Sequence, residues 1–461
     1  MSTVAFHTLG CKVNSYDTEA IWNLFKQKGY SQVDFDDQAD VYIVNTCTVT
    51  NTGDKKSRQM IRRAIRTNPD ATIVVTGCYA QVAPDEILEI PGVDLVIGTQ
   101  GREQILDYVE RAQEEKSPFK VVSSVRKQRE FEELDVFDFT DRTRASLKIQ
   151  EGCNNFCTFC IIPYSRGFIR SRKPENVIKQ AKKLVEAGYY EIVLTGIHTG
   201  GYGDDLENYT LADLLVDLER EVPDLRRIRI SSIEASELDD KMIEVLSKSK
   251  KIVRHLHIPL QAGSNRVLDR MNRKYTVEEF ADRLKEVRKA LGDLAITSDV
   301  IVGFPGETVE DFEQTYNFIK EQHFADLHVF PYSRRNFTPA AKYKEQLTER
   351  EKEARVNRLI TLANTLQVQY SSKFIGEELE VIPEERNEAG KLVGYSDNYI
   401  KIEFDGDDEL LAEVVKVRLD AAGPAVSQGT FVERLTFTEK HDEQQPLSDN
   451  PFAGAMELEM I

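Results

Sequence analysis

Six cysteines form the most informative pattern in this chain of 461 residues, and three of them lie within eight positions. Cys153, Cys157 and Cys160 make a C-x3-C-x2-C run, and no fourth Cys or His follows at the spacing of a zinc finger. A thioredoxin-like pair of Cys157 and Cys160 would leave Cys153 without a role. Three thiolates suit an iron-sulfur cubane whose fourth iron stays open to a substrate or cofactor, which implies chemistry rather than simple electron transfer.

Cys11, Cys47 and Cys78 are far apart in the sequence, but each follows a short apolar segment that predicts a strand and precedes a helical pattern. The expected strands cover 4–9, 41–46 and 72–77, and the expected helices cover 15–28, 54–66 and 84–89. Intervals of 36 and 31 residues between the cysteines are close to one β-α-β unit, whose strands are parallel. Parallel strands bring their carboxyl ends to one edge, where α/β sheets bind ligands, so we expect these thiols to converge.

Two other interpretations of the cysteines stay open at this point. An even count allows three disulfides, although a cytosolic chain of this length is kept reduced and needs no covalent crosslinks. The first three cysteines could also be free thiols that pack as small apolar side chains at strand ends.

The C-x3-C-x2-C run, with Phe159 before its last cysteine, resembles the radical S-adenosylmethionine signature. The segments Thr8-Leu9-Gly10-Cys11, Asn45-Thr46-Cys47 and Thr76-Gly77-Cys78 resemble those of the methylthiotransferase subgroup. Within that subgroup, TGIHTGGYG at 195–203 and SSIEAS at 231–236 are most similar to the enzymes that act on threonylcarbamoyladenosine in transfer RNA. The resemblance covers about residues 1 to 437.

The resemblance implies two 4Fe-4S clusters and S-adenosylmethionine as cofactors. Cys11, Cys47 and Cys78 would hold an auxiliary cluster, and Cys153, Cys157 and Cys160 would hold the radical S-adenosylmethionine cluster. Two S-adenosylmethionine molecules per turnover would methylate a sulfur on the auxiliary cluster and supply a 5′-deoxyadenosyl radical. The product would be 2-methylthio-N6-threonylcarbamoyladenosine at position 37 of transfer RNA, with no catalytic side chains beyond the cluster ligands.

The resemblance also implies an electron donor, such as flavodoxin or ferredoxin, and a sulfur donor as partners. Sister groups perform the same chemistry on N6-isopentenyladenosine 37 of transfer RNA or on an aspartate of a ribosomal protein, so these substrates stay open. A non-catalytic iron-sulfur carrier or RNA-binding protein is the alternative of another class. Two triads with an open iron argue against a carrier, because a carrier needs exposed, labile ligands.

The order of the expected elements predicts an α/β fold class with three domains. An N-terminal parallel α/β domain covers 1–125, and a charged linker covers 126–144. Over 145–347, six expected strands alternate with amphipathic helices, which predicts an open (β/α)6 partial TIM-like barrel with its active site at the carboxyl ends of the strands. The strands are expected at 146–150, 191–195, 227–231, 255–260, 296–302 and 327–331, and the helices at 175–187, 211–221, 238–247, 277–291 and 309–321.

A connecting helix at 348–374 leads to five short β-like segments within 375–437, which predict a small antiparallel β-barrel. The segments cover 379–383, 392–396, 400–404, 412–418 and 431–437. This barrel takes the place of the RNA-binding TRAM domain of related enzymes, but its 6 basic and 15 acidic residues argue against strong phosphate binding. The last segment, 438–461, has few large apolar residues and is expected to be a flexible tail.

Several residues near the expected strand ends are candidates for S-adenosylmethionine contacts. The candidates are Phe159, Gly200, Gly201, Gln261, Ser264 and Asp299. The two glycines resemble the turn that meets the methionine amino group in the superfamily, and the last three sit where a barrel places ligand contacts. Hydrogen bonding within loops is the alternative for these polar side chains. His257 and His328 lie within expected strands and receive no catalytic role.

The formal charge of −18 argues against non-specific nucleic-acid binding, so an RNA partner must meet a locally basic surface. Two basic groups follow the proposed cluster ligands. The first consists of Lys55, Lys56, Arg58, Arg62, Arg63 and Arg66, and the second of Arg166, Arg170, Arg172 and Lys173. A solvated helix face is the alternative interpretation of such a charge run.

Composition limits the class of protein further. With 41% hydrophobic and 30% charged residues, and no apolar run near the 18 needed to span a bilayer, the chain is expected to be globular and without a membrane partner. Residues 1–12 lack the basic and apolar regions of a secretion signal, which predicts a cytoplasmic location.

Overall fold

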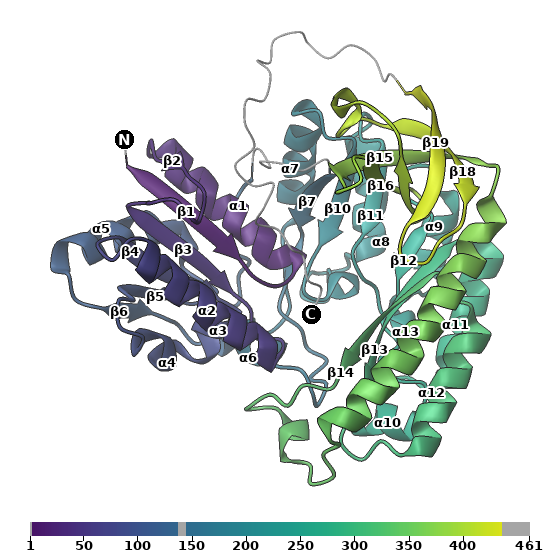
Figure 1. Ribbon diagram of the computed structural model, residues 1–461, viewed down its shortest axis with the longest axis horizontal. Helices are drawn as coiled ribbons and strands as arrows, with labels where there is room; N and C mark the ends of the chain where they lie inside the picture. Colours follow the sequence, from purple (N-terminus) through teal and green to yellow (C-terminus); the bar gives the residue numbers. More distant parts are fainter. Residues whose placement is uncertain (1, 137–143, 436–461) are drawn as a thin grey trace.

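The computed structural model describes residues 2–136 and 144–435, whose elements form three groups along the chain (Figure 1). An N-terminal sheet with helices, a central arc of strands and helices, and a C-terminal barrel follow one another, as predicted. Within the described residues, no helix combines the length and the apolar character needed to cross a membrane.

The N-terminal sheet has six strands in the order β2-β1-β3-β4-β5-β6, and every neighbouring pair is parallel. Its elements are β1 (Thr3–Thr8), α1 (Lys12–Gln27), β2 (Ser31–Gln32), β3 (Val41–Thr46), α2 (Asn51–Thr67), β4 (Thr72–Gly77), α3 (Cys78–Val82), α4 (Pro84–Leu88), β5 (Leu95–Ile97), η1 (Arg102–Gln104), α5 (Ile105–Glu115), β6 (Phe119–Val121) and η2 (Val125–Lys127). Strands β3 and β4 are buried along their whole length, as in sheets covered by helices on both faces. The strand order reverses between β1 and β3, and such a switch point is where doubly wound sheets bind ligands.

Two helices of this domain begin earlier than the sequence pattern predicted. Helix α1 starts at Lys12, with Cys11 in the N-cap position. Helix α2 starts at Asn51 rather than at residue 54, and its cap is Thr50, whose hydroxyl accepts a hydrogen bond from the Gly53 amide at 3.1 Å. The apolar period locates the first packed turn, whereas a cap lies in the polar loop before it. Helix α3 was not predicted, because five residues are too few to show a period.

The segment assigned to a linker packs into the structure as far as residue 136. Leu134 and Val136 join the buried core of the central domain. Glu132 pairs with the buried guanidinium of Arg102 at 2.6 Å. Residues 137–143, which complete that predicted linker, lie outside the described residues.

The central domain is an arc of six parallel strands in the order β7-β10-β11-β12-β13-β14 (Figure 1). Regular pairing stops between β11 and β12, where a single bridge between Ile228 and Ile252 joins two three-stranded sheets. Its elements are β7 (Arg144–Lys148), β8 (Gln150–Glu151), α6 (Ile162–Ser165), β9 (Arg170–Ser171), α7 (Pro174–Glu186), β10 (Glu191–Thr195), η3 (Thr199–Gly201), α8 (Leu211–Glu221), β11 (Arg227–Ile230), η4 (Ala235–Glu237), α9 (Asp240–Lys248), β12 (His255–His257), α10 (Asn265–Arg270), α11 (Val277–Leu291), β13 (Ala295–Val302), α12 (Val309–Gln322) and β14 (Asp326–Pro331). The long helices lie outside the arc, and the main hydrophobic core fills the space between strands and helices.

The inner face of the arc is polar, unlike the packed interior of a closed TIM barrel. Along β7, Ala145 and Leu147 enter the outer core, so the alternation of a strand places Arg144, Ser146 and Lys148 on the other face. The other strands contribute Glu191, Arg229, His257 and Asp299 in the same way. A polar inner surface suits a ligand better than it suits a core.

Helix α13 connects the arc to a closed barrel of five strands in the order β15-β16-β17-β19-β18, consistent with a TRAM domain. These elements are η5 (Pro339–Lys342), α13 (Glu349–Ser371), η6 (Ser372–Phe374), β15 (Glu378–Arg386), β16 (Leu392–Ser396), β17 (Lys401–Phe404), η7 (Asp408–Leu410), β18 (Val415–Ala421) and β19 (Ser427–Arg434). The β17–β19 pair is parallel, so the prediction of a wholly antiparallel barrel was wrong for that pair.

The last strand of the barrel was predicted too late in the sequence, at 431–437. Strand β19 begins at Ser427 and passes through Gly429, which packs against the β18 backbone. Glycine is depleted in strands, so the sequence pattern starts only after it. Residues 436–461, including the predicted tail at 438–461, lie outside the described residues.

The C-terminal barrel contacts the arc at the amino ends of its strands. Arg144, the first residue of β7, pairs with Glu384 of β15 at 2.6 Å. The Tyr399 ring stacks on His255, the first residue of β12, with ring centroids 3.9 Å apart and an interplanar angle of 9°. The carboxyl ends of the strands, at the other end of the arc, stay clear of these contacts.

Glu191 is the buried anion of this junction, with a relative exposure of 1%. Arg229 donates to its Oε1 from Nε at 2.6 Å, and Arg144 and Arg227 lie at 3.6 and 3.7 Å. Burial alone would raise the pKa of Glu191, but the three guanidinium groups, Arg229 foremost, lower it to about 2. Glu191 therefore stays ionised at neutral pH.

Candidate active site

The first three cysteines lie at one edge of the N-terminal sheet, around its switch point. Cys11 follows β1, Cys47 follows β3, and Cys78 begins α3 directly after β4. Gly10 has a positive φ of 104°, and a Cβ on it would lie 3.0 Å from the Cys47 sulfur. Only glycine allows the turn before α1 to pass this close to Cys47.

The thiols of this set are close enough to affect one another's ionisation. Burial, together with the neighbouring sulfurs of Cys78 and Cys11, raises the pKa of Cys47 to about 12. Cys11 keeps contact with solvent, although enough protein surrounds it for desolvation to raise its pKa as well. Iron binding would displace these protons, because the thiolate is the form that binds metal.

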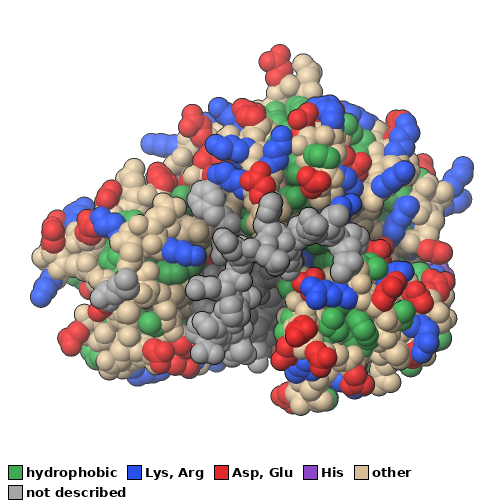
Figure 2. All heavy atoms as spheres, turned by 90° about the horizontal axis from the view of Figure 1, so that it is seen from above, with side chains coloured by type: hydrophobic (Ala, Val, Ile, Leu, Met, Phe, Trp, Pro, Cys, Tyr) green, Lys and Arg blue, Asp and Glu red, His purple; other side chains and the backbone are tan. Residues whose placement is uncertain are grey.

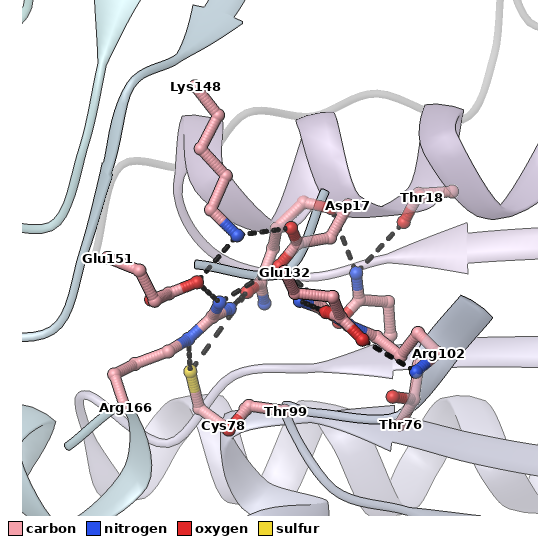
Figure 3. A network of polar contacts seen from close by, with 12 residues as sticks. Asp17, Thr18, Thr76, Cys78, Thr99, Arg102, Glu132, Lys148, Glu151 and Arg166 are labelled. Atoms are coloured by element: carbon pink, nitrogen blue, oxygen red, sulfur yellow. Dashed lines mark hydrogen bonds and ion pairs between the residues drawn. The ribbon is translucent and has the colours of Figure 1, made fainter. Parts of the chain in front are cut away.

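Arg166 connects the first cysteine set with the segment that carries the second. Its Nε donates to the Cys78 sulfur at 3.1 Å, and its side chain is fully buried. It stands six residues after Cys160, at the end of α6. Its Nη1 donates to carboxylates of Asp17 and Glu151 at 2.9 Å each (Figure 3).

Arg166 belongs to a buried cluster of six charges with balanced signs (Figure 3). The cations are Arg102, Lys148 and Arg166, and the carboxylates are Asp17, Glu132 and Glu151. Lys148 lies 2.8 Å from Asp17 and 2.5 Å from Glu151. Burial alone would raise the pKa of both carboxyl groups, but the cations lower that of Glu151 to about 2 and hold that of Asp17 well below its usual range. This charge cluster joins α1, the predicted linker segment and the central domain.

Cys153, Cys157 and Cys160 lie in the loop between β8 and α6. The Cys160 amide donates to the Cys157 carbonyl at 3.0 Å, and the Cys153 amide donates to the Gly167 carbonyl at 3.0 Å, so the loop folds back on itself. Burial raises the pKa of Cys157 and Cys160, and other thiols of the set raise it further in both cases. The second set is therefore also a group of neighbouring thiols.

Two ion pairs flank this second set. Arg273 donates from Nη1 to the Cys157 sulfur at 3.3 Å and pairs with Glu234. His198 contacts the first cysteine of the set and lies 2.5 Å from Glu237. Burial would lower the pKa of His198, but the cysteine and the Glu237 carboxylate raise it to about 11.

Each cysteine set supplies three thiols, the number of protein ligands that a 4Fe-4S cluster with one open iron needs. Among the described residues, no three His, Cys, Asp or Glu side chains come close enough to share a single metal ion. A cubane needs a wider arrangement, because each thiolate binds a different iron atom. In each set a guanidinium group donates to one sulfur, from Arg166 to Cys78 and from Arg273 to Cys157, which would offset the negative charge of a thiolate-bound cluster.

The glycine-rich turn after β10 is packed too tightly for other residues. A Cβ on Gly200 would lie 1.7 Å from a Glu237 oxygen, and a Cβ on Gly201 would lie 2.8 Å from Nδ1 of His198. These contacts place the turn beside the second cysteine set. Phe159 is partly buried against the central core. A direct contact of these residues with S-adenosylmethionine stays a prediction.

Gln261 and Asp299 are close to each other in the arc, because a single bridge joins Gln261 to Val300 of β13, the residue after Asp299. Gln261 has a positive φ of 65° beyond the end of β12. The Asp299 carboxylate lies 3.3 Å from His257 and 3.7 Å from His328, within the polar inner face. These positions are compatible with the predicted cofactor contacts, which no contact in the structure tests.

Ser264 does not face this inner surface. Its side chain is buried, and its hydroxyl donates to Asp311 of α12 at 2.8 Å. This hydrogen bond supports the turn before α10, and the predicted contact of Ser264 with S-adenosylmethionine stays a prediction. Serine commonly satisfies such local hydrogen bonds, which the sequence could not distinguish from a ligand contact.

The prediction that Arg166, Arg170 and Arg172 meet RNA phosphates was wrong, because these side chains are at most 1% exposed. Arg166 belongs to the buried charge cluster, and Arg170 donates to two main-chain carbonyls. Arg172 pairs with Glu133 at 2.7 Å and with Asp135 at 2.6 Å. A local count of cations cannot show that distant carboxylates will pair with them.

The other basic group lies on α2 and is only partly paired. Arg58 and Arg63 pair with carboxylates, and Lys56 is half-buried. The exposed members without a hydrogen bond or ion pair to a described residue are Lys55, Arg62 and Arg66. On the face shown in Figure 2, basic and acidic side chains are interspersed over the described surface, so this face shows no broad basic patch.

Sequence reasoning missed Gln150, His198 and Arg273. Gln150 is fully buried, donates to the Gly152 carbonyl at 2.7 Å and accepts from the His198 amide at 2.8 Å. It thereby holds the start of the cysteine loop against the glycine-rich turn. The only local signal for Gln150 and His198 is a polar residue near a strand end, which many purely structural residues share. Arg273 lies in the loop after α10 and lacks even this signal.

Two family models match the chain. The model described as "Uncharacterized protein family UPF0004" matches residues 3–98, and the model of the radical SAM superfamily matches residues 147–319. Each covers one cysteine set. The solved structure of the radical S-adenosylmethionine methyltransferase TsrM from Kitasatospora setae, with cobalamin and a [4Fe-4S] cluster bound, is similar with a TM-score of 0.55. The match covers 74% of this chain and 77% of that one at 15% identity, so it supports the fold alone.

Relatives of known function extend over nearly the whole chain. The threonylcarbamoyladenosine tRNA methylthiotransferase MtaB of Bacillus subtilis (strain 168) is 62% identical over 436 residues, which are 94% of this chain and 97% of the relative. The same-named protein of Aquifex aeolicus is 42% identical over 88% of this chain and 98% of its own. The tRNA-2-methylthio-N(6)-dimethylallyladenosine synthase of Clostridium novyi is 34% identical over 92% and 95%.

The fold and the C-x3-C-x2-C loop define a radical S-adenosylmethionine enzyme. Within that class, the chain belongs to the family of tRNA methylthiotransferases.

Proposed function

We propose that the protein transfers a methylthio group to carbon 2 of N6-threonylcarbamoyladenosine at position 37 of transfer RNA. The observation that carries this proposal is the 62% identity to the Bacillus subtilis threonylcarbamoyladenosine tRNA methylthiotransferase over 94% of the chain. Clostridial relatives named for dimethylallyladenosine reach 34% and 35%, which gives isopentenyladenosine less support. The transfer-RNA relatives also favour RNA over an aspartate of a ribosomal protein.

Two 4Fe-4S clusters and S-adenosylmethionine, used twice per turnover, are the proposed cofactors. The ligands would be Cys11, Cys47 and Cys78 for the auxiliary cluster and Cys153, Cys157 and Cys160 for the other. When bound, these groups would supply the sulfur and the radical chemistry that breaks an aromatic C–H bond. The chain itself holds the two cysteine sets in a fixed relation, since Arg166 touches Cys78 and lies in the segment that follows Cys160.

An electron donor, such as flavodoxin or ferredoxin, and a sulfur donor complete the proposed reaction. Reductive cleavage of S-adenosylmethionine consumes an electron, and each turnover removes one sulfur atom from the protein. The proposed place of action is the cytoplasm, where the substrate RNA occurs.

The substrate RNA is expected to place phosphates along α2, which begins four residues after Cys47. A base that reaches the space between the cysteine sets leaves its own backbone outside. The exposed cations on this helix that pair with no described residue are Lys55, Arg62 and Arg66. They are therefore the candidates for phosphate contacts, in place of the buried arginines of the second basic group.

Replacing Lys55, Arg62 and Arg66 together by glutamine is expected to weaken RNA binding and its dependence on salt. Each lost phosphate contact makes the plot of log K against log salt concentration less steep by about 0.7 to 0.9, so the triple variant is expected to lose about 2 to 3. Fluorescence anisotropy of a labelled anticodon stem-loop between low and moderate salt measures this slope. The matched control replaces Lys248, Lys285 and Lys289 of the outer helices, which changes the net charge equally. Equal slopes for the two triple variants would show that α2 does not contact the phosphates.

Mass spectrometry of nucleosides tests the proposed function directly. Transfer RNA that carries threonylcarbamoyladenosine is incubated anaerobically with reconstituted enzyme, dithionite and S-adenosylmethionine. A methylthio group gained on threonylcarbamoyladenosine is the expected result. If 5′-deoxyadenosine accumulates without that product, while RNA carrying isopentenyladenosine is modified, the assigned substrate is wrong and the class of chemistry stands.

A further inference from the structure

Lys12 is a cation that pairs with none of the described residues, and it lies where the N-terminal domain meets the arc. It follows Cys11 directly, opens α1 and has an exposed side chain. It makes no hydrogen bond or ion pair with any residue within 2–136 or 144–435. The charged groups that act on it come from the arc and the C-terminal barrel, and they are Arg144, Arg229, Glu191 and Glu384.

The carboxylates in this group are already engaged by arginines. Glu191 accepts a hydrogen bond from Arg229 at 2.6 Å, and Glu384 pairs with Arg144 at 2.6 Å. Arg227, which lies 3.7 Å from Glu191 and pairs with Glu380 at 2.7 Å, belongs to the same group. Together with Lys12, four cations therefore face three carboxylates, which leaves one positive charge in excess. In addition, Nη1 of Arg229 is buried and has no hydrogen-bond acceptor among the described atoms.

Two tyrosines of the C-terminal barrel fix the positions of these arginines. The rings of Tyr395 and Tyr399 stack with centroids 4.9 Å apart. Arg144 lies over Tyr395 at 5.6 Å, and Arg229 lies over Tyr399 at 5.4 Å. Cation–π contacts of this kind hold a guanidinium group in place, so the excess charge sits in a preformed site.

An anion in this site would lie beside the first cysteine set, because Lys12 and Cys11 are adjacent in the chain. The threonylcarbamoyl group supplies such an anion: its threonine nitrogen is acylated and its carboxyl group stays free and ionised. A dimethylallyl group is an uncharged hydrocarbon, and an unmodified adenine carries nothing at this position. A carboxylate would therefore distinguish one substrate from the other two.

We propose that Lys12, supported by Arg144 and Arg229, binds the carboxylate of the threonyl group and so selects threonylcarbamoyladenosine. This inference rests on the proposed function and names the group of the substrate that the enzyme recognises. A charge-assisted hydrogen bond is stronger than a neutral one, and its loss leaves the partner charge unpaired. Removing either charge is expected to weaken binding about 10- to 100-fold.

The test combines a change in the protein with a change in the RNA. Three anticodon stem-loops are compared, with threonylcarbamoyladenosine, its methyl ester or adenosine at position 37, and their dissociation constants are measured with the anaerobic holoenzyme. The wild type is expected to bind the acid about 10- to 100-fold more tightly than the ester. Lys12→Met is expected to bind acid and ester equally, and Lys12→Arg to restore the preference. Lys26→Met, at the other end of α1, is the matched control and is expected to behave as the wild type.

Two results would overturn the inference. In the first, Lys12→Met prefers the acid over the ester by the same factor as the wild type. In the second, Lys12→Met loses affinity equally for all three RNAs, which would show that Lys12 attracts phosphates in general. The absorption and EPR spectra of the clusters confirm that each variant is loaded. Methylthiolation of the same stem-loops is assayed separately, and the proposed function fails only if the wild type does not modify the stem-loop that carries threonylcarbamoyladenosine.

Discussion

Replacing Cys78 by alanine is expected to stop methylthio transfer while cleavage of S-adenosylmethionine to 5′-deoxyadenosine continues. Cys78 belongs to the first cysteine set, whereas the second set lies on a separate loop that this change leaves intact. Arg166 keeps Asp17 and Glu151 as partners, so the buried charge cluster survives. Iron content is expected to fall to about half of that of the wild type, because one of two clusters is lost.

The measurement quantifies iron, 5′-deoxyadenosine and methylthio nucleoside in the same anaerobic samples. Cys157→Ala is the matched comparison, and it is expected to lose both products. A Cys78→Ala variant that still forms methylthio nucleoside at the wild-type rate would show that the first set holds no catalytic cluster. Loss of both products in both variants would show that the two sets do not act separately.

Replacing Arg166 by methionine is expected to reduce stability by about 3 to 5 kcal/mol, the usual effect of removing one partner from a buried ion pair. The change leaves Asp17 and Glu151 with one positive charge fewer in a fully buried place. Methionine fills much of the volume, so the loss comes from the charge rather than from a cavity. Urea unfolding followed by the fluorescence of Trp22, the single tryptophan, reports directly on α1, which also carries Asp17.

Arg58→Met is the matched control for that measurement. Arg58 also pairs with a glutamate, but its side chain is 31% exposed, and exposed pairs contribute about 0 to 1 kcal/mol. Arg166→Lys is expected to fall between the two, because it keeps the charge and loses the branched donor geometry. If the free energy of unfolding of Arg166→Met lies within 1 kcal/mol of the wild-type value, the charge cluster does not hold the domains together.

The strands around the cysteines could be predicted because local pattern and long-range geometry agree there. Strands β3 and β4 begin and end where their apolar segments do, and parallel pairing then brings the residues after them to one edge. The short helix α3 and the N-cap position of Cys11 could not be predicted, since neither produces a hydrophobic period in the sequence.

The arginines after the second cysteine set show why the rest of the site was not predictable. An arginine that binds phosphate and an arginine that binds a buried carboxylate occur in the same kind of sequence segment. Arg166 finds Asp17 across 149 positions of sequence, and Arg172 finds Glu133 across 39. Only the packing of the domains shows which of these roles an arginine has, and the same is true of Lys12.

The junction between the C-terminal barrel and the arc limits how these enzymes can be recombined. Arg144 and Arg227 of the arc meet Glu384 and Glu380 of β15, and His255 stacks on a tyrosine of the barrel. A chimera that takes this barrel from another family member would bring foreign residues against the buried Arg227 and the half-buried Arg144. Exchange of C-terminal barrels between such enzymes is therefore expected to succeed only when Arg144 and Arg227, the first residues of their strands, are exchanged together with the barrel.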